Sequence, residues 1–446
     1  MPSELPRRVL DVTLRAGAGA HAELLAFHRQ RGDELRTVDA SAHVRGAIGS
    51  SFEIVALLRR ELAAYRPELV YAPDLAHEDA HARALAHALA AAAAAAPCPS
   101  ALALLYGGEG DVAFEGTEAR FRRADSAQLL ALARARRSKD LPRATAVVST
   151  WNKKEDVRAN LDGLRSQTLP FAEIVVVDNS SGDGTAEMIA RDYPDVRLIV
   201  MPHSRYGACE TFNIGFASAQ TELTAILDDD IVMPPEWLER ATRRIAREPP
   251  TTAVLSTQVI EPDMPASYRD SPHVNTERYM STFRGCASLA RSKALREAEY
   301  YDERLFIYGN ERDLTCRLLN LGYRVLQYPE ASVFHKTPFG IKMGKRSLYY
   351  HARNAWLSML KYAPLSDLLR MPWLVFSKVV LRGSKKEAEG TVTDAVGTIG
   401  IGKSLRETPG AWWVVMRAAW NVLLNVPYCL KHRRPVRAQD FELPLH

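Results

Sequence analysis

Three adjacent carboxylates follow an apolar segment near the middle of the chain. Asp228, Asp229 and Asp230 come directly after Ala225-Ile226-Leu227, which has the pattern of a buried strand. Carboxylates side by side repel one another, and a hard divalent cation that also binds a diphosphate relieves the repulsion. The run therefore predicts a metal site. A solvated acidic turn or a helix cap is the alternative.

A second polar segment, Asp178-Asn179-Ser180-Ser181-Gly182-Asp183-Gly184-Thr185, follows another strand-like run. A carboxylate at a strand end can accept hydrogen bonds from a nucleobase or a ribose, and the amino end of a helix favours anions. The segment is equally compatible with an ordinary turn, in which Asp183 or Thr185 caps the next helix.

Two acidic residues lie at the start of a helical pattern near residue 310. Leu314, Leu318 and Leu321 fall on one helical face, so Glu311 and Asp313 belong to the first turn. Glu311 is a candidate general base, whereas the helix dipole alone explains Asp313. His335 follows the strand-like 331–334 and would complete a metal site, although a lone histidine is more often structural.

These residues must be positioned by the elements between residues 144 and 336, where strands and helices alternate. The predicted strands are 146–149, 173–177, 196–200 and 223–227, and the predicted helices are 154–166, 185–191, 211–219 and 235–247. Such alternation predicts parallel strands with crossover helices, whose ligands bind at the carboxyl ends of the strands.

The order of the motifs resembles the inverting family 2 glycosyltransferases of GT-A fold, and within them the rhamnosyltransferase-like bacterial branch. The likeness covers about residues 144–340. It rests on Thr150-Trp151-Asn152, VVVDNSSGDGT, Gly207 and Asn213 in RYGACETFNIG, ILDDD, the acidic helix start, LGYRV and VFH.

The resemblance implies a Rossmann-like GT-A domain with a mostly parallel sheet. Asp228 and Asp230 would bind Mg²⁺ or Mn²⁺ with His335 beside them, and Asp178 would contact the nucleobase. The implied donor-binding residues are Thr150, Asn152, Asp178, Ser180, Asp183, Arg205, Gly207, Asn213, Asp228 and Asp229.

The resemblance also implies a reaction and a base. Members of the family have Glu-Asp where this chain has Asn310-Glu311, and the second residue of the pair is the base. Glu311 therefore takes the position of the base. The implied reaction moves a sugar from a nucleotide-diphosphate sugar to a hydroxyl of a glycan or lipid-linked acceptor, in cell-surface polysaccharide or glycolipid synthesis. Because this pair is unusual for the family, a second hypothesis remains: the chain is a catalytically weak scaffold that binds a nucleotide sugar or glycan.

The two ends of the chain differ from the middle. Residues 1–139 predict a small α/β accessory domain, with strands at 8–14, 68–72 and 101–106 and helices at 53–65 and 79–96. Within it, His77, Asp79 and His81 faintly resemble the second zinc motif of LmbE-like deacetylases, but the first motif of that family is absent. A helix with exposed histidines is the alternative.

The C-terminal region, 346–446, predicts amphipathic helices after the 144–345 catalytic domain. Arg417, Asn421 and Asn425 recur every four residues along an otherwise apolar helix, and Lys431, Arg433, Arg434 and Arg437 follow it. This pattern favours attachment to an anionic membrane surface. Packing on the catalytic domain or in a homo-oligomer is the alternative.

The composition of the chain excludes several classes of protein. The 446 residues are 47% hydrophobic and 25% charged, which excludes a disordered or collagenous protein. The net charge of +5 does not argue for nucleic acid, and five scattered cysteines fit neither a zinc knuckle nor a disulfide scaffold. Without a signal peptide or an apolar segment long enough to span a bilayer, the expected location is cytoplasmic, peripheral at the inner face of the cell membrane.

Overall fold

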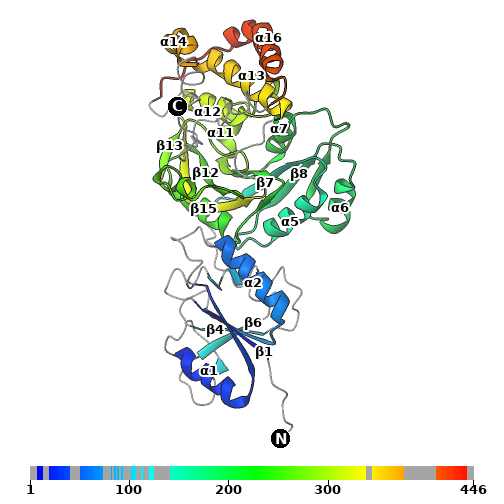
Figure 1. Ribbon diagram of the computed structural model, residues 1–446, viewed down its shortest axis with the longest axis vertical. Helices are drawn as coiled ribbons and strands as arrows, with labels where there is room; N and C mark the ends of the chain where they lie inside the picture. Colours follow the sequence, from blue (N-terminus) through cyan, green and yellow to red (C-terminus); the bar gives the residue numbers. More distant parts are fainter. Residues whose placement is uncertain are drawn as a thin grey trace.

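The computed structural model describes residues 8–13, 20–40, 51–73, seven positions between 82 and 93, 102–106, 112–113, 120–124, 141–337, 344–375 and 408–438. Three parts follow one another along the long axis of the molecule (Figure 1). A small N-terminal sheet lies at one end, a larger sheet lies in the middle, and the C-terminal helices lie at the other end.

The N-terminal part contains a six-stranded sheet with helices α1 and α2. Its sheet has the order β2-β1-β3-β4-β6-β5, with β1 to β4 parallel and β6 antiparallel. The elements are β1 (Arg8–Thr13), α1 (Ala20–Arg31), β2 (Glu34–Asp39), α2 (Ser51–Tyr65), β3 (Leu69–Pro73), β4 (Leu102–Tyr106), β5 (Val112–Ala113) and β6 (Arg120–Ala124). The three predicted strands and the helix at 53–65 are confirmed, whereas α1, β2, β5 and β6 were not predicted. His77, Asp79 and His81 lie outside the described residues.

The first half of the larger sheet has the predicted alternation. Its strands and helices are β7 (Ala144–Thr150), α5 (Lys154–Arg165), β8 (Glu173–Asp178), α6 (Thr185–Asp192), β9 (Arg197–Val200), α7 (Ala208–Ser218) and β10 (Leu223–Asp228). The four strands are parallel, in the spatial order β10-β7-β8-β9. Each is a short β-branched run, and the crossover helices return the chain in the same direction.

The second half of the sheet is mixed, and most of it was not predicted. The chain continues through β11 (Ile231–Val232), α8 (Trp237–Arg247), β12 (Thr252–Ile260), α9 (Ala266–Arg269), α10 (Pro272–Asn275), β13 (Arg278–Met280), β14 (Ala287–Arg291), α11 (Ser292–Glu297), a 3₁₀ turn (Glu303–Leu305), α12 (Asn310–Asn320) and β15 (Arg324–His335). The sheet has the order β11-β15-β12-β14-β10-β7-β8-β9, and β14 is antiparallel to both of its neighbours. The α/β class with a mostly parallel sheet is confirmed.

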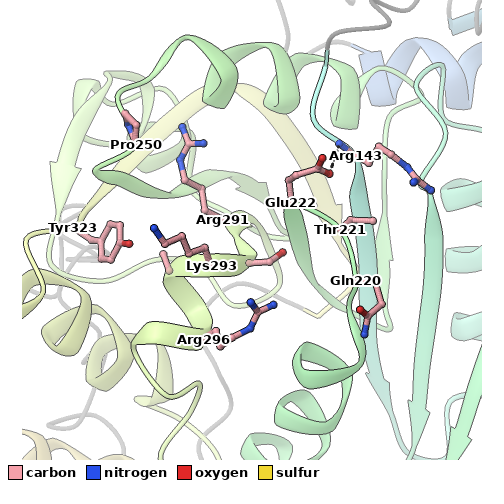
Figure 2. Close-up of a pocket in the computed structure, with 11 residues that line it drawn as sticks. Arg143, Gln220, Thr221, Glu222, Pro250, Arg291, Lys293, Arg296 and Tyr323 are labelled. Carbon is pink, nitrogen blue, oxygen red and sulfur yellow. Dashed lines mark hydrogen bonds between the residues drawn. The ribbon is translucent and has the colours of Figure 1, made fainter.

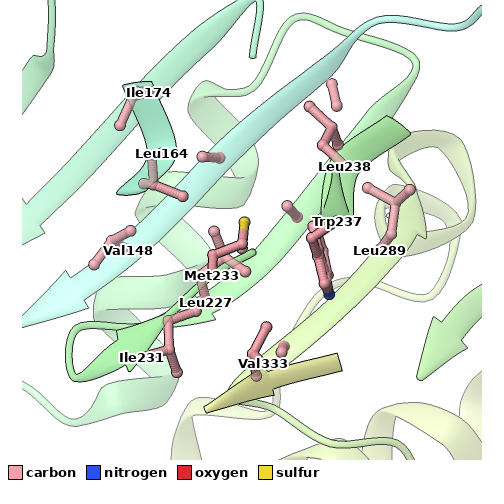
Figure 3. Close-up of a cluster of buried hydrophobic side chains, with 14 of the residues drawn as sticks. Val148, Leu164, Ile174, Leu227, Ile231, Met233, Trp237, Leu238, Leu289 and Val333 are labelled. Atoms are coloured by element: carbon pink, nitrogen blue, oxygen red, sulfur yellow. The ribbon is translucent and has the colours of Figure 1, made fainter. Parts of the chain in front are cut away.

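Two layers of helices cover this sheet. Side chains from α5, α6 and α8 pack on one face around Trp237, which is 1% exposed (Figure 3). Helices α7, α11 and α12 cover the opposite face, together with Leu357, Val422 and Cys429 of the C-terminal helices. Because successive residues of a strand point to opposite faces, Val148 belongs to the first layer and Val147 to the second. The sheet is therefore buried on both sides, and its ligands have access only at an edge or at the strand ends.

In the described residues of the C-terminal end, 344–375 and 408–438, three helices are present: α13 (Lys345–Tyr362), α14 (Leu365–Val375) and α16 (Ala411–Lys431). Among the described residues, none of the helices combines the length and apolarity that crossing a bilayer requires. The polar stripe predicted on α16 is turned toward α13: Asn421 Oδ1 accepts a hydrogen bond from Arg353 Nε at 2.5 Å, and the Arg417 guanidinium lies 5.3 Å from the Tyr349 ring centre.

Candidate active site

The ends of three parallel strands bring the predicted polar residues together. Thr150 at the end of β7 pairs with Asp178 of β8, and Asp228 of β10 pairs with Ser149. The motifs that are far apart in the sequence therefore meet at one edge of the sheet, as expected for parallel strands.

A short strand pairing places His335 next to the acidic run. β11 follows Asp230 directly and pairs with the end of β15, so that Ile231 lies opposite His335. The Lys336 amide donates to the Asp230 carbonyl at 3.0 Å, and His335 Nε2 lies 3.0 Å from Asp230 and 3.8 Å from Asp228. The backbone thus sets the distance between this histidine and the carboxylates.

Three residues that the sequence did not single out complete this cluster. The Lys153 ammonium lies 3.2 Å from Asp229 and 2.8 Å from Asp230, and the Thr337 hydroxyl donates to Asp230 at 3.0 Å. Glu261, the residue after β12, lies 2.9 Å from His335 Nδ1. Because β12 is parallel to β15, a search of the residues that directly follow strands would find Glu261 once β12 is recognised. The only feature of the sequence that pointed to Lys153 was its position next to Asn152.

The charges in the cluster perturb one another strongly. Burial raises the pKa of Asp228 to about 7, and the neighbouring charges of Asp230 and Asp229 act in the same direction. Burial also opposes ionisation of Asp230, but hydrogen bonds from His335 and Lys153 hold its pKa well below the usual range. The same contact with Asp230, together with Glu261, raises the pKa of His335 to about 10 against the effect of burial. Carboxylates this close are stable only beside cations.

The residues fit a divalent cation. One ligand atom from each of Asp228, Asp230 and His335 lies within 4.8 Å of the others. Two carboxylate oxygens and one imidazole nitrogen form a donor set that suits Mn²⁺, and Mg²⁺ when water completes the shell. The predicted ligands are therefore brought together, and Glu261 holds the imidazole from its other nitrogen.

Glu311 lies close to this cluster, on the first turn of α12. A Cβ atom added at Gly285 would lie 2.2 Å from Glu311 Oε1, so the carboxyl group packs against the Gly285 backbone. The next residue, Cys286, accepts a hydrogen bond from the Asp228 amide at 3.1 Å. Burial raises the pKa of Glu311 to about 7, and the charge of Asp228 contributes to the shift. A carboxyl group with a pKa near neutrality suits a general base.

Asp313 points away from the cluster, into a buried network of ion pairs. It is 0% exposed and contacts Arg317 at 3.1 Å and the Lys361 ammonium. Lys361 also lies 2.8 Å from Asp302, which accepts a hydrogen bond from Tyr428. Asp313 thus joins α12 to α13. The sequence had indicated only a favourable interaction of this carboxylate with the helix dipole.

The Asp178–Thr185 loop is held by its own hydrogen bonds. Asp178 is 0% exposed, and its oxygens accept from the Ser181 amide at 3.0 Å and the Ser181 hydroxyl at 2.5 Å. Asp183 accepts from the amides of Thr185 and Lys154, but the N-cap residue of α6 is Gly184, so neither residue considered as a cap occupies that position. Ser180 adopts a left-handed φ of 56° at the turn. Nucleobase binding by Asp178 and donor contacts by Ser180 and Asp183 stay predictions.

The other predicted donor-binding residues have mixed surroundings. Asn152 accepts from the Gly182 amide at 2.8 Å and so links the first two strand-end loops. The Asn213 side chain bonds both the amide and the carbonyl of Tyr301, each at 2.9 Å, which fixes the 301–303 segment instead of presenting the amide to a ligand. Arg205 is exposed in the loop before α7.

Gly207 marks a close approach of two backbones. A Cβ atom there would lie 2.4 Å from the Phe306 carbonyl oxygen, which also accepts from the Cys209 amide. Asn354 of α13 holds the same loop, donating to the carbonyls of Leu305, Ile307 and Tyr308 at 2.9, 2.9 and 2.8 Å. The loop that leads to Glu311 is therefore fixed from two sides.

We expect Gly207→Ala to destabilise the fold by roughly 1–3 kcal/mol, because the added methyl group overlaps a backbone atom that cannot move freely. Gly182→Ala is the matched control, since nothing lies within 4 Å of a Cβ atom at that position. Urea denaturation of the two variants measures the difference. Equal urea midpoints of the two variants would show that the loop around residue 306 moves away from the added methyl group at little cost in free energy.

A separate cavity of about 540 Å³ lies at the opposite edge of the sheet (Figure 2). It is bordered by Arg143 and Glu222, which precede β7 and β10, and by Arg291 at the end of β14. The Arg291 guanidinium donates to the carbonyls of Thr252, Ile245 and Glu248, so this charge stabilises the structure. The cavity faces the amino ends of the parallel strands, away from the acidic cluster.

Comparison with known proteins agrees with the strand-end motifs. Residues 145–304 match the family described as glycosyl transferase family 2. The chain is 32% identical to the glycosyltransferase AglE of Haloferax volcanii over 111 residues, which cover 24% of this chain and 36% of AglE. It is 30% identical to the succinoglycan biosynthesis protein ExoO of Rhizobium meliloti over 124 residues, or 28% of this chain and 35% of ExoO. The chain thus spans about a third of the length of these curated relatives.

Two solved structures are similar at lower identity. The mannosyltransferase PcManGT of Pyrobaculum calidifontis, solved with GDP-Man and Mn²⁺, aligns at 18% identity and a TM-score of 0.40, over 65% of this chain and 76% of its own. TarS of S. aureus, solved with UDP-GlcNAc, aligns at 16% identity and a TM-score of 0.45, over 65% and 84%. The family match and the strand-end motifs that it spans identify residues 145–304 as a glycosyltransferase family 2 domain.

Proposed function

We propose that the 144–345 region is an inverting, metal-dependent glycosyltransferase of GT-A type. It moves a hexosyl or deoxyhexosyl group from a nucleoside-diphosphate sugar to a hydroxyl of a glycan or lipid-linked acceptor. The name of the Rhizobium relative, a succinoglycan biosynthesis protein, favours synthesis of a cell-surface polysaccharide or glycolipid. The rhamnosyltransferase-like branch of the family is part of this proposal.

One observation carries the proposal: the acidic cluster and Glu311 lie against the same strand ends. Gly285 packs on the Glu311 carboxyl, and its neighbour Cys286 is hydrogen-bonded to Asp228. A carboxyl group with a pKa near 7 beside a diphosphate-binding cluster is the arrangement that a single displacement needs.

The residues divide the work in the following way. The end of β8 and the Thr150 segment receive the nucleoside, and Lys153 lies where it can meet the negative diphosphate. When bound at Asp228, Asp230 and His335, Mg²⁺ or Mn²⁺ supplies positive charge that stabilises the leaving diphosphate. Glu311 accepts the proton of the acceptor hydroxyl while the oxygen of that hydroxyl forms a bond to the anomeric carbon. The nucleoside diphosphate leaves from the opposite face, so the anomeric configuration inverts.

The test is release of nucleoside diphosphate from a panel of nucleotide sugars, with and without acceptor extracts, in Mn²⁺ or Mg²⁺. Acceptor-dependent release with one donor is the expected result. Metal-dependent thermal stabilisation by a donor without any release would support the non-catalytic scaffold instead.

We expect Asp230→Asn to lower turnover at least about 10²-fold and to remove the effect of metal on donor binding, because the variant loses one ligand charge without changing volume. The assay is transfer as a function of Mn²⁺ concentration. Asp192→Asn makes the same change in a surface ion pair with Arg158 and should leave transfer unaltered. Full activity of Asp230→Asn, or of the wild type in excess chelator, would refute the metal site.

A further inference from the structure

The apolar residues of α16 lie on its outer side. Its exposed large hydrophobic side chains are between 46% and 76% exposed. They are Trp412, Trp413, Met416, Trp420, Leu423, Leu424 and Leu430. Their spacing follows the helical repeat, so they form one continuous stripe of roughly 27 Å, at 1.5 Å per residue.

The polar residues of α16 lie on its inner side. Asn421 bonds Arg353 of α13, and Asn425 donates to the carbonyl of Asn421 at 2.8 Å. Ala418, Val422 and Cys429 of the same helix are buried. A helix on a water-exposed surface has the reverse arrangement, with apolar residues inside and polar residues outside. The outer side of α16 therefore suits a less polar surrounding than water.

Helix α14 repeats the pattern at the same end of the molecule. Leu365, Leu369 and Trp373, spaced by four residues, are 64–76% exposed. Figure 1 places α13, α14 and α16 together, remote from the N-terminal sheet. Of the fifteen large hydrophobic side chains that are exposed among the described residues, eleven belong to these three helices. We call the exposed stripes of α14 and α16 the apolar face.

The charges around the apolar face select its partner. Residues 344–375 and 408–438 contain ten Lys or Arg, of which Arg353 and Lys361 are buried, and one acidic residue, Asp367. A second copy of the chain would bring the same positive charges to a two-fold interface, which disfavours a dimer. Anionic lipid headgroups are complementary to these charges, and tryptophan prefers the boundary between headgroups and acyl chains.

We propose that the apolar face docks on a bilayer that contains anionic lipids, with α16 lying in the plane of the membrane surface. Its tryptophan and leucine side chains enter the headgroup boundary, while Lys431 and Arg437 contact the headgroups. The inward Asn421 and Asn425 keep the helix attached to α13. The proposal concerns the location of the enzyme and holds whatever sugar it transfers.

Vesicle flotation of the full chain tests this docking. Wild-type protein should float with phosphatidylcholine vesicles containing about a third phosphatidylserine, less with pure phosphatidylcholine, and less at about 0.5 M salt. The triple variant Trp413→Ser/Trp420→Ser/Leu424→Ser should lower the bound fraction at least 10-fold, because it removes three outward side chains from the stripe. Lys431→Gln/Arg437→Gln should remove most of the preference for phosphatidylserine.

The controls separate docking from misfolding and from dimer formation. Val200→Ser/Leu321→Ser removes exposed apolar side chains elsewhere and should float like the wild type. The triple variant should keep the wild-type melting temperature, because the replaced residues face outward. Arg433 is left intact, since it donates to the Leu360 and Ala363 carbonyls. Wild-type protein that fails to float would overturn the proposal. Light scattering would then show whether the wild type is a monomer or a dimer that the triple variant dissociates, and either result contradicts docking on a membrane.

Discussion

Glu311→Gln should lower turnover by roughly 10²-fold to 10⁴-fold while leaving the affinity for the nucleotide-sugar donor nearly unchanged. The amide has the same size as the carboxylate and keeps the packing against Gly285, but it cannot accept the proton of the acceptor. Single-turnover kinetics and donor titration measure the two effects separately. Glu311→Asp restores the residue usual in the family with a shorter reach and should retain partial activity.

The pH profile gives an independent control for this role. Because burial raises the pKa of Glu311 to about 7, the side chain is protonated below that pH and cannot act as a base. Wild-type turnover should therefore fall as the pH is lowered through 7. This limb should be shallower in Glu311→Gln, where the Asp228 carboxyl, whose pKa is also raised to about 7, still titrates. If Glu311→Gln kept the wild-type rate, the base would have to be another residue.

Asp313→Asn should destabilise the protein by about 3–5 kcal/mol, because within the described part of the chain it leaves the buried ammonium of Lys361 paired with the Asp302 carboxylate alone. This is more than the 1 kcal/mol or less expected from the helix dipole alone. The midpoint of urea-induced unfolding, followed by circular dichroism, measures the effect. At temperatures where the variant remains folded, its turnover should stay far above that of Glu311→Gln.

A double-mutant cycle distinguishes the ion pair from a general effect of substitution. Asp313→Asn/Lys361→Met should cost less than the sum of its two single variants, since neither charge is then left without its partner. The matched control is Lys293→Met, which breaks an exposed pair with Glu297 and should shift stability by less than about 0.5 kcal/mol. Additive effects within the cycle would show that Asp313 and Lys361 do not stabilise each other.

The first half of the catalytic sheet could be predicted because its information is local. β7, β8, β9 and β10 are short β-branched runs that end in polar turns, and each is followed by an amphipathic helix. Strands of this kind pair in parallel almost by necessity, so the meeting of Thr150, Asp178 and Asp228 followed from topology. Glu311 and His335 required the resemblance to a family, since their own segments indicate only a helix start and a strand end.

The remainder depends on pairings that local sequence does not encode. The contact of Glu261 with His335 requires the parallel pairing of β12 and β15, which includes a register shift between Thr257 and Gln258. Lys361 meets Asp313 from a helix 48 residues further along the chain. Helix α1 carries too little amphipathic pattern to be recognised, and β2 is mostly exposed. The spacing of the Arg417 stripe predicted its helix, but not that the stripe would face the protein.

The three hydrogen bonds from Asn354 have a consequence for exchanging parts between relatives. Phe306 and Tyr308 have left-handed φ values of 68° and 66°, which are unfavourable for bulky residues. The Asn354 amide bonds the carbonyl of Tyr308 and those of both neighbours of Phe306. The family match ends at residue 304, whereas Asn354 lies fifty residues beyond it. A chimera joined between residue 308 and α13 would keep the loop but lose the Asn354 amide that stabilises it. A transplantable unit with new donor preference must therefore extend through α13.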